Sequence, residues 1–361
     1  MPGDIGVFQG GNERPTLVNA QPRIVREPHI AGTVAIVNGL PGCGKTLMTA
    51  IVGTLERVEL MRYNYHLEHV CALWHLGALA EDAAIALLRL QTDLDLYDGT
   101  MGRETNFRFS DISSPWTNGR MLRYVARLLR AGDAAAAERI KTQRPILHLA
   151  THSLLGVGGI LLKALGARLR FLEVVRHPLY MVKQWYTWMP RAGTDPRMFG
   201  LWIEHSGVAL PWWTRGWEEL FLESNRMDRT IYSIETQWRM AMGTLDAMSP
   251  EERASVLVVP FERLVVNPEP YLDELQRFLE TRVTAGTRRM MRRQNVPRQM
   301  YAEGIPLKIY KQYGWEPPEK GSDEGRELAR RREWVMAEAS VAALKTLDEL
   351  SESYEAQYLA T

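Results

Sequence analysis

Short apolar runs alternate along this chain with longer segments of helical spacing. The apolar runs fall at residues 33–38, 59–63, 146–150, 170–175 and 256–259. Each is short and rich in aliphatic or β-branched residues, which predicts a buried strand. Helical spacing of apolar residues begins at 46 and recurs at about 66–90, 120–141, 178–188, 225–247, 267–279 and 322–359. This alternation predicts an α/β fold, with a central mostly parallel sheet flanked by helices.

Local signals support several of these boundaries. Pro178 suits the first turn of a helix, where its missing N–H is not needed. The segment 249–252 (SPEE) has the form of a capping box, which predicts a helix start. Residues 91–118 show no periodicity, so we predict a long functional or mobile loop there.

The sequence predicts that the chain is organised in three regions. Residues 1–30, rich in Gly, Pro and Asn, form an irregular lead-in. Residues 31–285 form one α/β domain, and residues 286–361 are a basic segment and a helical C-terminal extension packed on that domain. The longest apolar run, 154–162, is too short to span a bilayer, so we expect no integral membrane segment.

A glycine-rich loop follows the first predicted strand. Residues 39–46 (GLPGCGKT) match the phosphate-loop pattern G-x-x-x-x-G-K-[ST] in full, between a strand and a helix. Backbone N–H groups of such a loop surround an anion, the following helix points its positive end at it, and the lysine adds a charge. The predicted phosphate-binding residues are Leu40, Pro41, Gly42, Cys43, Gly44, Lys45 and Thr46. The alternative is a glycine-rich turn with a chance lysine.

A kinase with this loop would also need an apolar strand that ends in Asp, to hold hydrated Mg²⁺ beside Thr46. The predicted strands end instead in Asn38, Ala150, Val175 and Pro260. Asp93, Asp95 and Asp98 remain as candidates in the predicted loop, but such acids are also common as solvated turn formers. No metal ligand is therefore assigned.

Three further stretches resemble sulfotransferases. Residues 171–186 (FLEVVRHPLYMVKQWY) are similar to the segment in which a strand delivers an Arg that grips the 3′-phosphate of the donor PAPS, 3′-phosphoadenosine-5′-phosphosulfate. Residues 256–279 (VLVVPFERLVVNPEPYLDELQRFL) resemble the family's later strand and "NPE" helix, and 146–154 (ILHLATHSL) the strand before its catalytic base. The resemblance covers roughly residues 31–285 and implies a P-loop sulfotransferase fold.

The resemblance also implies roles for individual residues. The loop from Leu40 to Thr46 would hold the 5′-phosphosulfate, Lys45 would neutralise the leaving group and Arg176 would bind the 3′-phosphate, with Gln184 at the position of a family serine. His152 would take the acceptor proton. Alternatively, Arg176 caps a helix or pairs with Glu, and His152 is a satisfied histidine near the core.

This chain also departs from the family. The cation of the loop stands at the position typical of nucleotide kinases, and Ala150 replaces a lysine two residues before the histidine. The closing Arg-Lys-Gly motif is not visible. A basic segment with Arg282, Arg288, Arg289, Arg292, Arg293 and Arg298 lies where the family closes over the nucleotide. Arg288 and Arg292 are four residues apart, so on a helix they share a face and can converge on a phosphate, or form a solvated face.

Aromatic residues suggest where an acceptor binds. Six of the eleven tryptophans lie between 185 and 217: Trp185, Trp188, Trp202, Trp212, Trp213 and Trp217. They can wall a pocket for a small-molecule, sugar or lipid-linked acceptor, or simply fill the core. The loop 91–118, with Arg103, Glu104, Arg108 and Asp111, is a candidate second wall or lid.

Composition narrows the class of protein further. The net charge of +1 gives no global field for nucleic acid, and two cysteines, Cys43 and Cys71, cannot form a disulfide framework. We therefore expect a cytoplasmic protein with no nucleic-acid partner. The resemblance to sulfotransferases implies a transferase that uses PAPS, and the oligomeric state stays open. The alternatives are a kinase that uses ATP or GTP with Mg²⁺ on Thr46 and a nucleotide-binding regulator without turnover.

Overall fold

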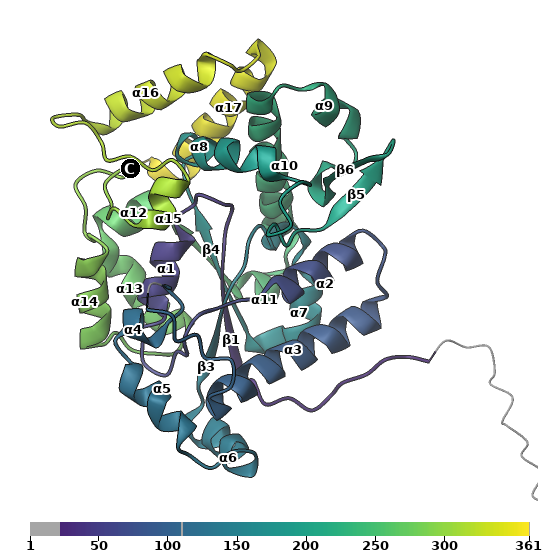
Figure 1. Cartoon of the computed structure of the whole chain (residues 1–361), viewed down its shortest axis with the longest axis vertical. Coiled ribbons are helices and arrows are strands. Elements are labelled where there is room, and N and C mark those ends of the chain that lie inside the picture. The colour runs from purple at the N-terminus through teal and green to yellow at the C-terminus, as the bar shows by residue number, and fades with distance from the viewer. Residues whose placement is uncertain (1–21, 110, 361) are drawn as a thin grey trace, which may run out of the picture.

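A sheet of five parallel strands forms the centre of the protein (Figure 1). The computed structural model describes residues 22–109 and 111–360. The strands are β1 (Thr33–Asn38), β2 (Arg62–Tyr63), β3 (Ile146–Ala150), β4 (Leu169–Val175) and β7 (Val256–Pro260). Their order is β2-β3-β1-β4-β7 and each neighbouring pair is parallel. The predicted fold class, a parallel sheet flanked by helices, is confirmed.

The helices lie in the chain segments between the strands, as the spacing of apolar residues predicted. Before β4 they are α1 (Lys45–Val52), α2 (Tyr65–His75), α3 (Glu81–Met101), α4 (Pro115–Asn118), α5 (Met121–Leu128), α6 (Ala134–Gln143) and α7 (Gly159–Leu165). After β4 they are α8 (Pro178–Trp188), α9 (Glu218–Glu223), α10 (Arg226–Ala247), α11 (Pro250–Arg253), α12 (Phe261–Val266), α13 (Pro268–Phe278), α14 (Ala285–Arg293), α15 (Lys308–Gln312), α16 (Glu324–Met336) and α17 (Val341–Tyr354). A separate antiparallel hairpin consists of β5 (Trp202–His205) and β6 (Val208–Pro211).

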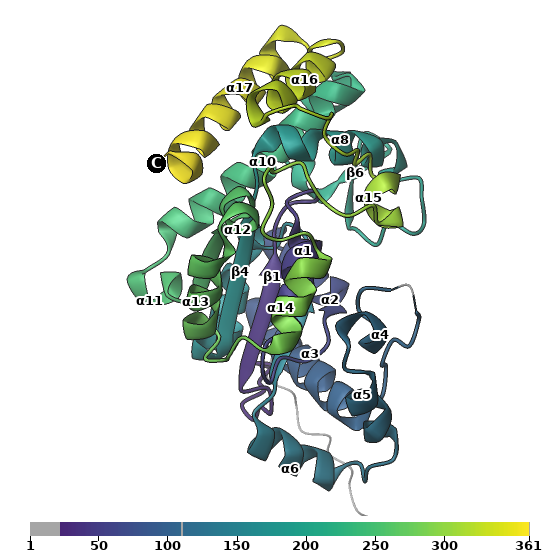
Figure 2. The same ribbon diagram turned by 90° about the vertical axis from the view of Figure 1, so that its left-hand side faces the viewer.

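Two hydrophobic cores lie on the two faces of the sheet. Side chains alternate along a strand, and on β1 Val34 and Ile36 join one core while Ala35 and Val37 join the other. The first core includes buried residues of α2, α3 and α7, and the second includes residues of α1, α8, α10, α12, α13 and α17. Both faces of the sheet are therefore covered (Figure 2).

The capping predictions agree with the structure. Pro178 occupies the first turn of α8, and Ser249 and Glu252 form both hydrogen bonds of a capping box at α11. Asn267 does precede α13, but its side chain makes no capping hydrogen bond. Residues 22–30 form neither helix nor strand, and the rest of the predicted lead-in, 1–21, lies outside the described residues.

The predicted loop at 91–118 is wrong over its first part, because α3 continues to Met101 and α4 lies within the remainder. Buried polar side chains hid the periodicity. Asp93 is 2% exposed and accepts hydrogen bonds from the backbone of Ile30 and Ala31 and from Arg26. Asp95 is also buried and accepts a hydrogen bond from Asn64. The buried face of α3 therefore carries carboxylates where an apolar pattern would be expected.

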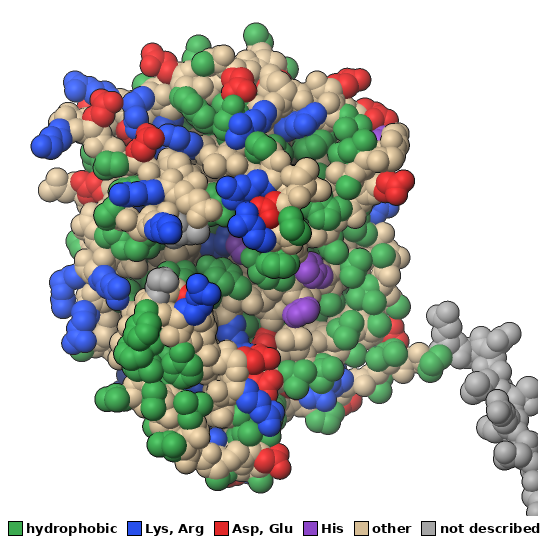
Figure 3. Space-filling view, in the orientation of Figure 1, with side chains coloured by type: hydrophobic (Ala, Val, Ile, Leu, Met, Phe, Trp, Pro, Cys, Tyr) green, Lys and Arg blue, Asp and Glu red, His purple; other side chains and the backbone are tan. Residues whose placement is uncertain are grey.

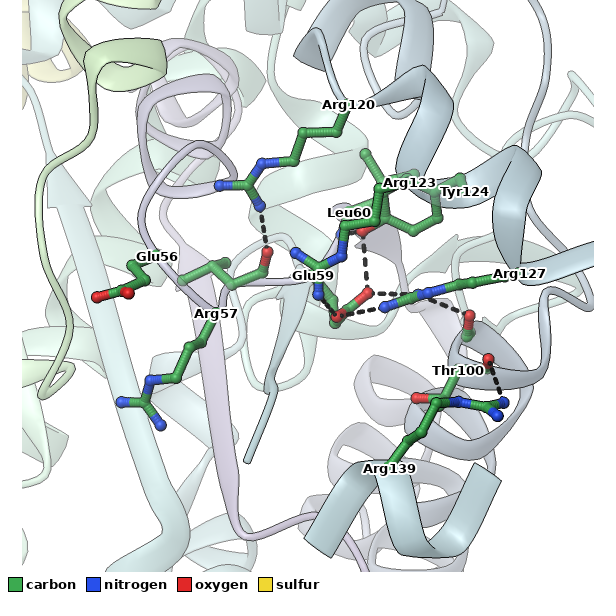
Figure 4. A network of polar contacts seen from close by, with 12 residues as sticks. Glu56, Arg57, Glu59, Leu60, Thr100, Arg120, Arg123, Tyr124, Arg127 and Arg139 are labelled. Atoms are coloured by element: carbon green, nitrogen blue, oxygen red, sulfur yellow. Dashed lines mark hydrogen bonds and ion pairs between the residues drawn. The ribbon is translucent and has the colours of Figure 1, made fainter. Parts of the chain in front are cut away.

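The strand predicted at 59–63 is limited to Arg62–Tyr63, and a buried ion-pair network lies just before it (Figure 4). The carboxylate of Glu59 accepts hydrogen bonds from Arg127, Arg123 and Tyr124. The Tyr124 hydroxyl accepts a hydrogen bond from the Leu60 backbone. This network fixes α5 against the start of β2.

The C-terminal helices α16 and α17 lie at the end of the molecule toward which the parallel strands point (Figures 1 and 2). Val335 of α16 and Leu347 of α17 belong to the same core as α1 and α8. Within the described residues, no helix is both long enough and apolar enough to cross a bilayer.

Candidate active site

A cavity of about 610 Å³ opens at the carboxyl edge of the sheet. The segments that line it include the glycine-rich loop, the residues after β3, helix α8, the segment 191–200 and the segment 298–315. Figure 3 shows Lys, Arg and His side chains around the hollow near the middle of this face. The size is typical of a small-molecule or cofactor site.

The glycine-rich loop forms the floor of the cavity. Pro41, Gly42, Gly44, Lys45 and Thr46 line it, whereas the side chains of Leu40 and Cys43 are buried behind it. Helix α1 begins at Lys45 without a side-chain cap, so its first N–H groups remain available to a ligand. This arrangement is the one that binds phosphate in P-loop proteins.

Close packing holds the loop in shape. Gly44 has a φ of 94°, and a Cβ on it would lie 2.2 Å from Cδ2 of Phe261. The indole N–H of Trp185 in α8 donates a 2.8 Å hydrogen bond to the Pro41 carbonyl. The Lys45 ammonium donates a 3.0 Å hydrogen bond to the Gly39 carbonyl. The loop is therefore preorganised by its own backbone and by two aromatic side chains.

Two groups in the loop have pKa values shifted by burial. Burial lowers the pKa of Lys45, although nearby Glu68 and Glu173 oppose this effect. Burial raises the pKa of the Cys43 thiol, which keeps it neutral. Cys43 is therefore a small buried loop residue in this structure and is not a reactive thiolate.

Asn38 joins the carboxyl ends of three strands. Its side-chain N–H donates to Glu173 of β4 at 2.6 Å, and its amide oxygen accepts from the hydroxyl of Thr151 and the backbone of Leu154, both after β3. Burial raises the pKa of Glu173 to about 7, despite the Asn38 hydrogen bond and the charge of Lys45. This amide fixes the loop after β1 relative to the residues after β3.

Arg176 follows β4 and reaches the loop from the adjacent strand. Its Nη1 donates a 3.0 Å hydrogen bond to the Gly42 carbonyl, and its guanidinium lies 4.3 Å from the ring centroid of Phe261. Its Nε is buried and has no hydrogen-bond partner among the described residues. Burial lowers the pKa of Arg176, and the charge of nearby Glu262 opposes this effect.

Arg298 is the residue of the basic segment that reaches the cavity. It is 8% exposed and donates to backbone carbonyls of Gln294, Asn295 and Tyr301. Burial and the charge of Arg176 lower its pKa to about 10. In the described residues, no carboxylate forms a salt bridge with Arg298 or with Arg176 within 4.0 Å.

Arg288 and Arg292 do not line the cavity. Both are exposed on α14, as the four-residue spacing allows, but Arg288 forms an ion pair with Glu269 of α13. The face of α14 that they share therefore points to solvent and to α13. The structure does not bring these two predicted ligands to the loop.

His152 lies beside the loop, just after β3, and lines the cavity. Its Nδ1 lies 3.2 Å from Oε1 of Glu68 in α2, which also accepts a hydrogen bond from the His152 backbone at 2.8 Å. Its ring stacks between those of Tyr63 and Tyr65, with centroid distances of 6.0 and 5.8 Å. Burial and the charge of Lys45 lower the pKa of His152, so the imidazole is neutral near pH 7.

Helix α8 supplies one wall of the cavity. Gln184 lines it beside Gly42, and Tyr180 and Lys183 lie on the same face. Tyr180 and Gln184 are four residues apart and so share this face, while Arg176 lies just before the helix. Sequence reasoning identified Arg176 and Gln184 but missed Tyr180, Lys183 and Glu68.

The candidate metal-binding acids lie elsewhere. Asp93 and Asp95 are buried in α3, and Asp98 pairs with Arg103. Thr151 follows β3 directly, and its hydroxyl donates a hydrogen bond to the amide oxygen of Asn38. Within 22–109 and 111–360, no group of three or more His, Cys, Asp and Glu residues is placed to hold a metal ion.

The predicted acceptor residues divide between cavity and core. Trp185, Trp188, Trp212 and Trp213 line the cavity, while Trp217 packs against Phe221 and Tyr232. The second wall consists of the segments 191–200 and 302–315. Arg103, Glu104, Arg108 and Asp111, expected in that wall, are not lining residues.

Comparisons with known proteins give only distant matches. No family model matches the chain, and no curated protein matches its sequence. The sulfotransferase domain of an olefin synthase from Synechococcus PCC 7002 matches 91% of this chain and 96% of its own, at 14% identity and a TM-score of 0.39. The sulfotransferase domain from the curacin biosynthetic pathway matches 84% of this chain and 98% of its own, at 14% identity and a TM-score of 0.38. We therefore take the function from the residues of this chain.

Proposed function

We propose that this chain is a sulfotransferase-like enzyme that transfers a sulfuryl group from PAPS to a hydroxyl or amine. One observation carries the proposal: a single cavity contains the phosphate loop with Lys45, the pair Arg176 and Arg298, and His152. Among the described residues, neither arginine forms a salt bridge with a carboxylate. The cavity therefore holds two separate anion-binding elements and a base. A donor with phosphate groups at both ends of its nucleoside carries negative charges that match these two elements.

The residues present fit this donor. The N–H groups of the loop and Lys45 would bind the 5′-phosphate, and the guanidinium of Arg176, with its unpartnered Nε, would bind the 3′-phosphate together with Arg298. Gln184 is a further polar contact beside Gly42. PAPS supplies a sulfuryl group bonded through an oxygen to its 5′-phosphate.

His152 and Lys45 would carry the proton and the charge during transfer. A neutral His152 accepts the acceptor proton on Nε2, while Glu68 holds its Nδ1–H. The acceptor oxygen or nitrogen forms a bond to sulfur as the bond from sulfur to the phosphate oxygen breaks. Lys45 and the loop N–H groups stabilise the negative charge that the phosphate keeps.

The acceptor would bind against the aromatic part of the cavity. Trp188, Trp212 and Trp213 line it together with Phe199, which suits a small-molecule, sugar or lipid-linked acceptor that presents a flat or apolar surface. Because Cys43 and Cys71 are buried free thiols, we further propose a reducing, cytoplasmic location.

Ligand-dependent thermal stability tests the proposal. Adenosine 3′,5′-bisphosphate should stabilise the protein without Mg²⁺, by about 2.7 kcal/mol at a hundredfold excess over its dissociation constant. Transfer of radiolabelled sulfate from PAPS to a panel of phenols, alcohols, sugars and amines then tests turnover. Absence of any response to the bisphosphate would disprove donor binding.

A Mg²⁺-dependent kinase for ATP or GTP is the second candidate. The complete phosphate-loop pattern favours it, since Lys45 and Thr46 both line the cavity at the positions that hold phosphate and Mg²⁺ in kinases. The same titration separates the two: stabilisation by ATP only with Mg²⁺ supports the kinase. Binding of either nucleotide without turnover over a broad acceptor panel would indicate a nucleotide-binding regulator.

A further inference from the structure

Helix α16 of the C-terminal extension contributes one arginine, Arg331, to the cavity. The guanidinium carbon of Arg331 lies 4.5 Å from the ring centroid of Tyr180, and that of Arg176 lies 4.8 Å from the same centroid. Arg331 lines the cavity with Arg176 and Arg298. Its positive charge acts on Arg176 and lowers the pKa of that group further, after the larger effect of burial.

We infer that Arg331 binds the same nucleotide phosphate as Arg176 and Arg298, so that the helical pair α16 and α17 is a working part of the donor site. This inference rests on the proposed function and extends it to residues outside the stretches that resemble sulfotransferases. The ligand group is a phosphate monoester, whose charge near −2 and three free oxygens suit three converging guanidinium groups. A donor without this phosphate would bring no negative charge to Arg176 and Arg298, for which no salt bridge is found in the described residues, and would leave Arg331 with Glu327 alone.

The side chain of Arg331 is held in place for this contact. Oε1 of buried Glu327 accepts a 2.8 Å hydrogen bond from its Nε and lies 2.7 Å from its Nη2. Its Nη1 has no hydrogen bond within the described part of the chain and remains available. The adjacent Arg330 pairs with the same carboxylate but is not a lining residue, and its side chain is 40% exposed compared with 15% for Arg331.

Helix α17 supports the same site from behind. The hydroxyl of Tyr354 donates a 2.5 Å hydrogen bond to Oε2 of Glu262, and Oε1 of Glu262 accepts the backbone N–H of His177 at 3.0 Å. Glu262 is fully buried, and its charge attracts Arg176. The C-terminal pair therefore both adds a cation and fixes the backbone that carries Arg176.

Affinity for two nucleotides tests this assignment. Calorimetric titration of the full chain with adenosine 3′,5′-bisphosphate and with adenosine 5′-monophosphate measures what the 3′-phosphate adds. Arg331→Gln should weaken bisphosphate binding by about tenfold or more and leave monophosphate binding unchanged, because a lost charged hydrogen bond costs about 1.5–3 kcal/mol. Arg330→Gln is the matched control, since it removes a neighbouring charge from the same carboxylate, and should change neither affinity.

The outcomes separate the two levels of the proposal. If the wild type binds the two nucleotides equally or binds neither, the proposed function is wrong. If the wild type prefers the bisphosphate and Arg331→Gln retains that full preference, the role of Arg331 is wrong and the proposed function stands. If Arg331→Gln fails to fold, Arg331→Met replaces it, because the methionine keeps the aliphatic stem beside Tyr180; a full preference in that variant overturns the role equally.

Discussion

The imidazole Nδ1 of His152 lies 3.2 Å from Oε1 of Glu68, which also accepts the His152 backbone N–H. The two contacts fix both the backbone and the ring orientation of the histidine. With the proton on Nδ1, the Nε2 atom is the acceptor, as a general base requires. Glu68 orients the histidine that would accept the proton and is therefore a positioning residue.

Replacement of Glu68 by Gln should lower the rate of sulfuryl transfer by at least about tenfold. The carboxylate charge raises the pKa of His152 against the opposing effects of burial and Lys45. Its removal lowers that pKa, so the acidic limb of the pH–rate profile should move to lower pH. Glu81→Gln alters an exposed acid that is paired with Lys163. It should change neither the rate nor the position of the acidic limb. A purely structural role would reduce the rate at every pH and leave the limb in place.

Replacement of Lys45 by Ala should reduce kcat by about a hundredfold or more, because Lys45 supplies the positive charge at the leaving phosphate. Lys163→Ala, which removes an exposed lysine, is the control. Single-turnover transfer from PAPS measures the effect, and unliganded melting temperature checks the fold. A Lys45→Ala variant with wild-type turnover would remove Lys45 from the proposed mechanism.

Replacement of Gly44 by Ala should abolish nucleotide-dependent stabilisation and lower the melting temperature. The new Cβ would meet Phe261 at 2.2 Å, and the φ of 94° is strained for alanine. Gly159→Ala in α7 is the matched control: no atom lies within 4 Å of its Cβ, and helical alanine gains up to about 1 kcal/mol over glycine. Normal nucleotide response in Gly44→Ala would mean that the loop does not require this contact.

Replacement of Glu173 by Gln should stabilise the protein at pH 8 and have little effect at pH 5. Burial raises the folded pKa of Glu173 to about 7, above the ordinary value of 4.5. In that interval the folded state binds more protons than the unfolded state, so the wild type loses stability as the pH rises. Gln keeps an acceptor for Asn38 and carries no charge. Denaturant unfolding at both pH values measures the difference, and an equal effect at pH 5 and pH 8 would contradict it.

Much of the phosphate loop and of the segment around Arg176 could be predicted from the sequence, because the signals that specify them are local. A glycine pattern between a strand and a helix specifies the loop, and Pro178 marks the start of α8 after Arg176. Both follow from the backbone rules for glycine and proline. The α/β alternation then places these elements at the carboxyl edge of one sheet.

The remaining contributions depend on contacts between distant segments, which carry no local signal. Glu68 and Arg331 are ordinary helical residues in sequence, and only the packing of α2 and α16 brings them to the cavity. The helical spacing of Arg288 and Arg292 correctly predicted that they share a face of a helix. It did not predict that this face points to solvent and to α13. Likewise, Asp93 and Asp95 read as loop acids because their buried partners lie far away in the chain.

The two halves of the cavity differ in construction. Its phosphate loop and Arg176 follow adjacent strands whose register, Asn38 opposite Glu173, is fixed by backbone hydrogen bonds. The other half includes the wall formed by the segments 191–200 and 302–315, which lie outside the sheet. Under the proposed function, new sequences in those segments would change which acceptor binds, while the strands would continue to hold the loop and Arg176 in place for the nucleotide.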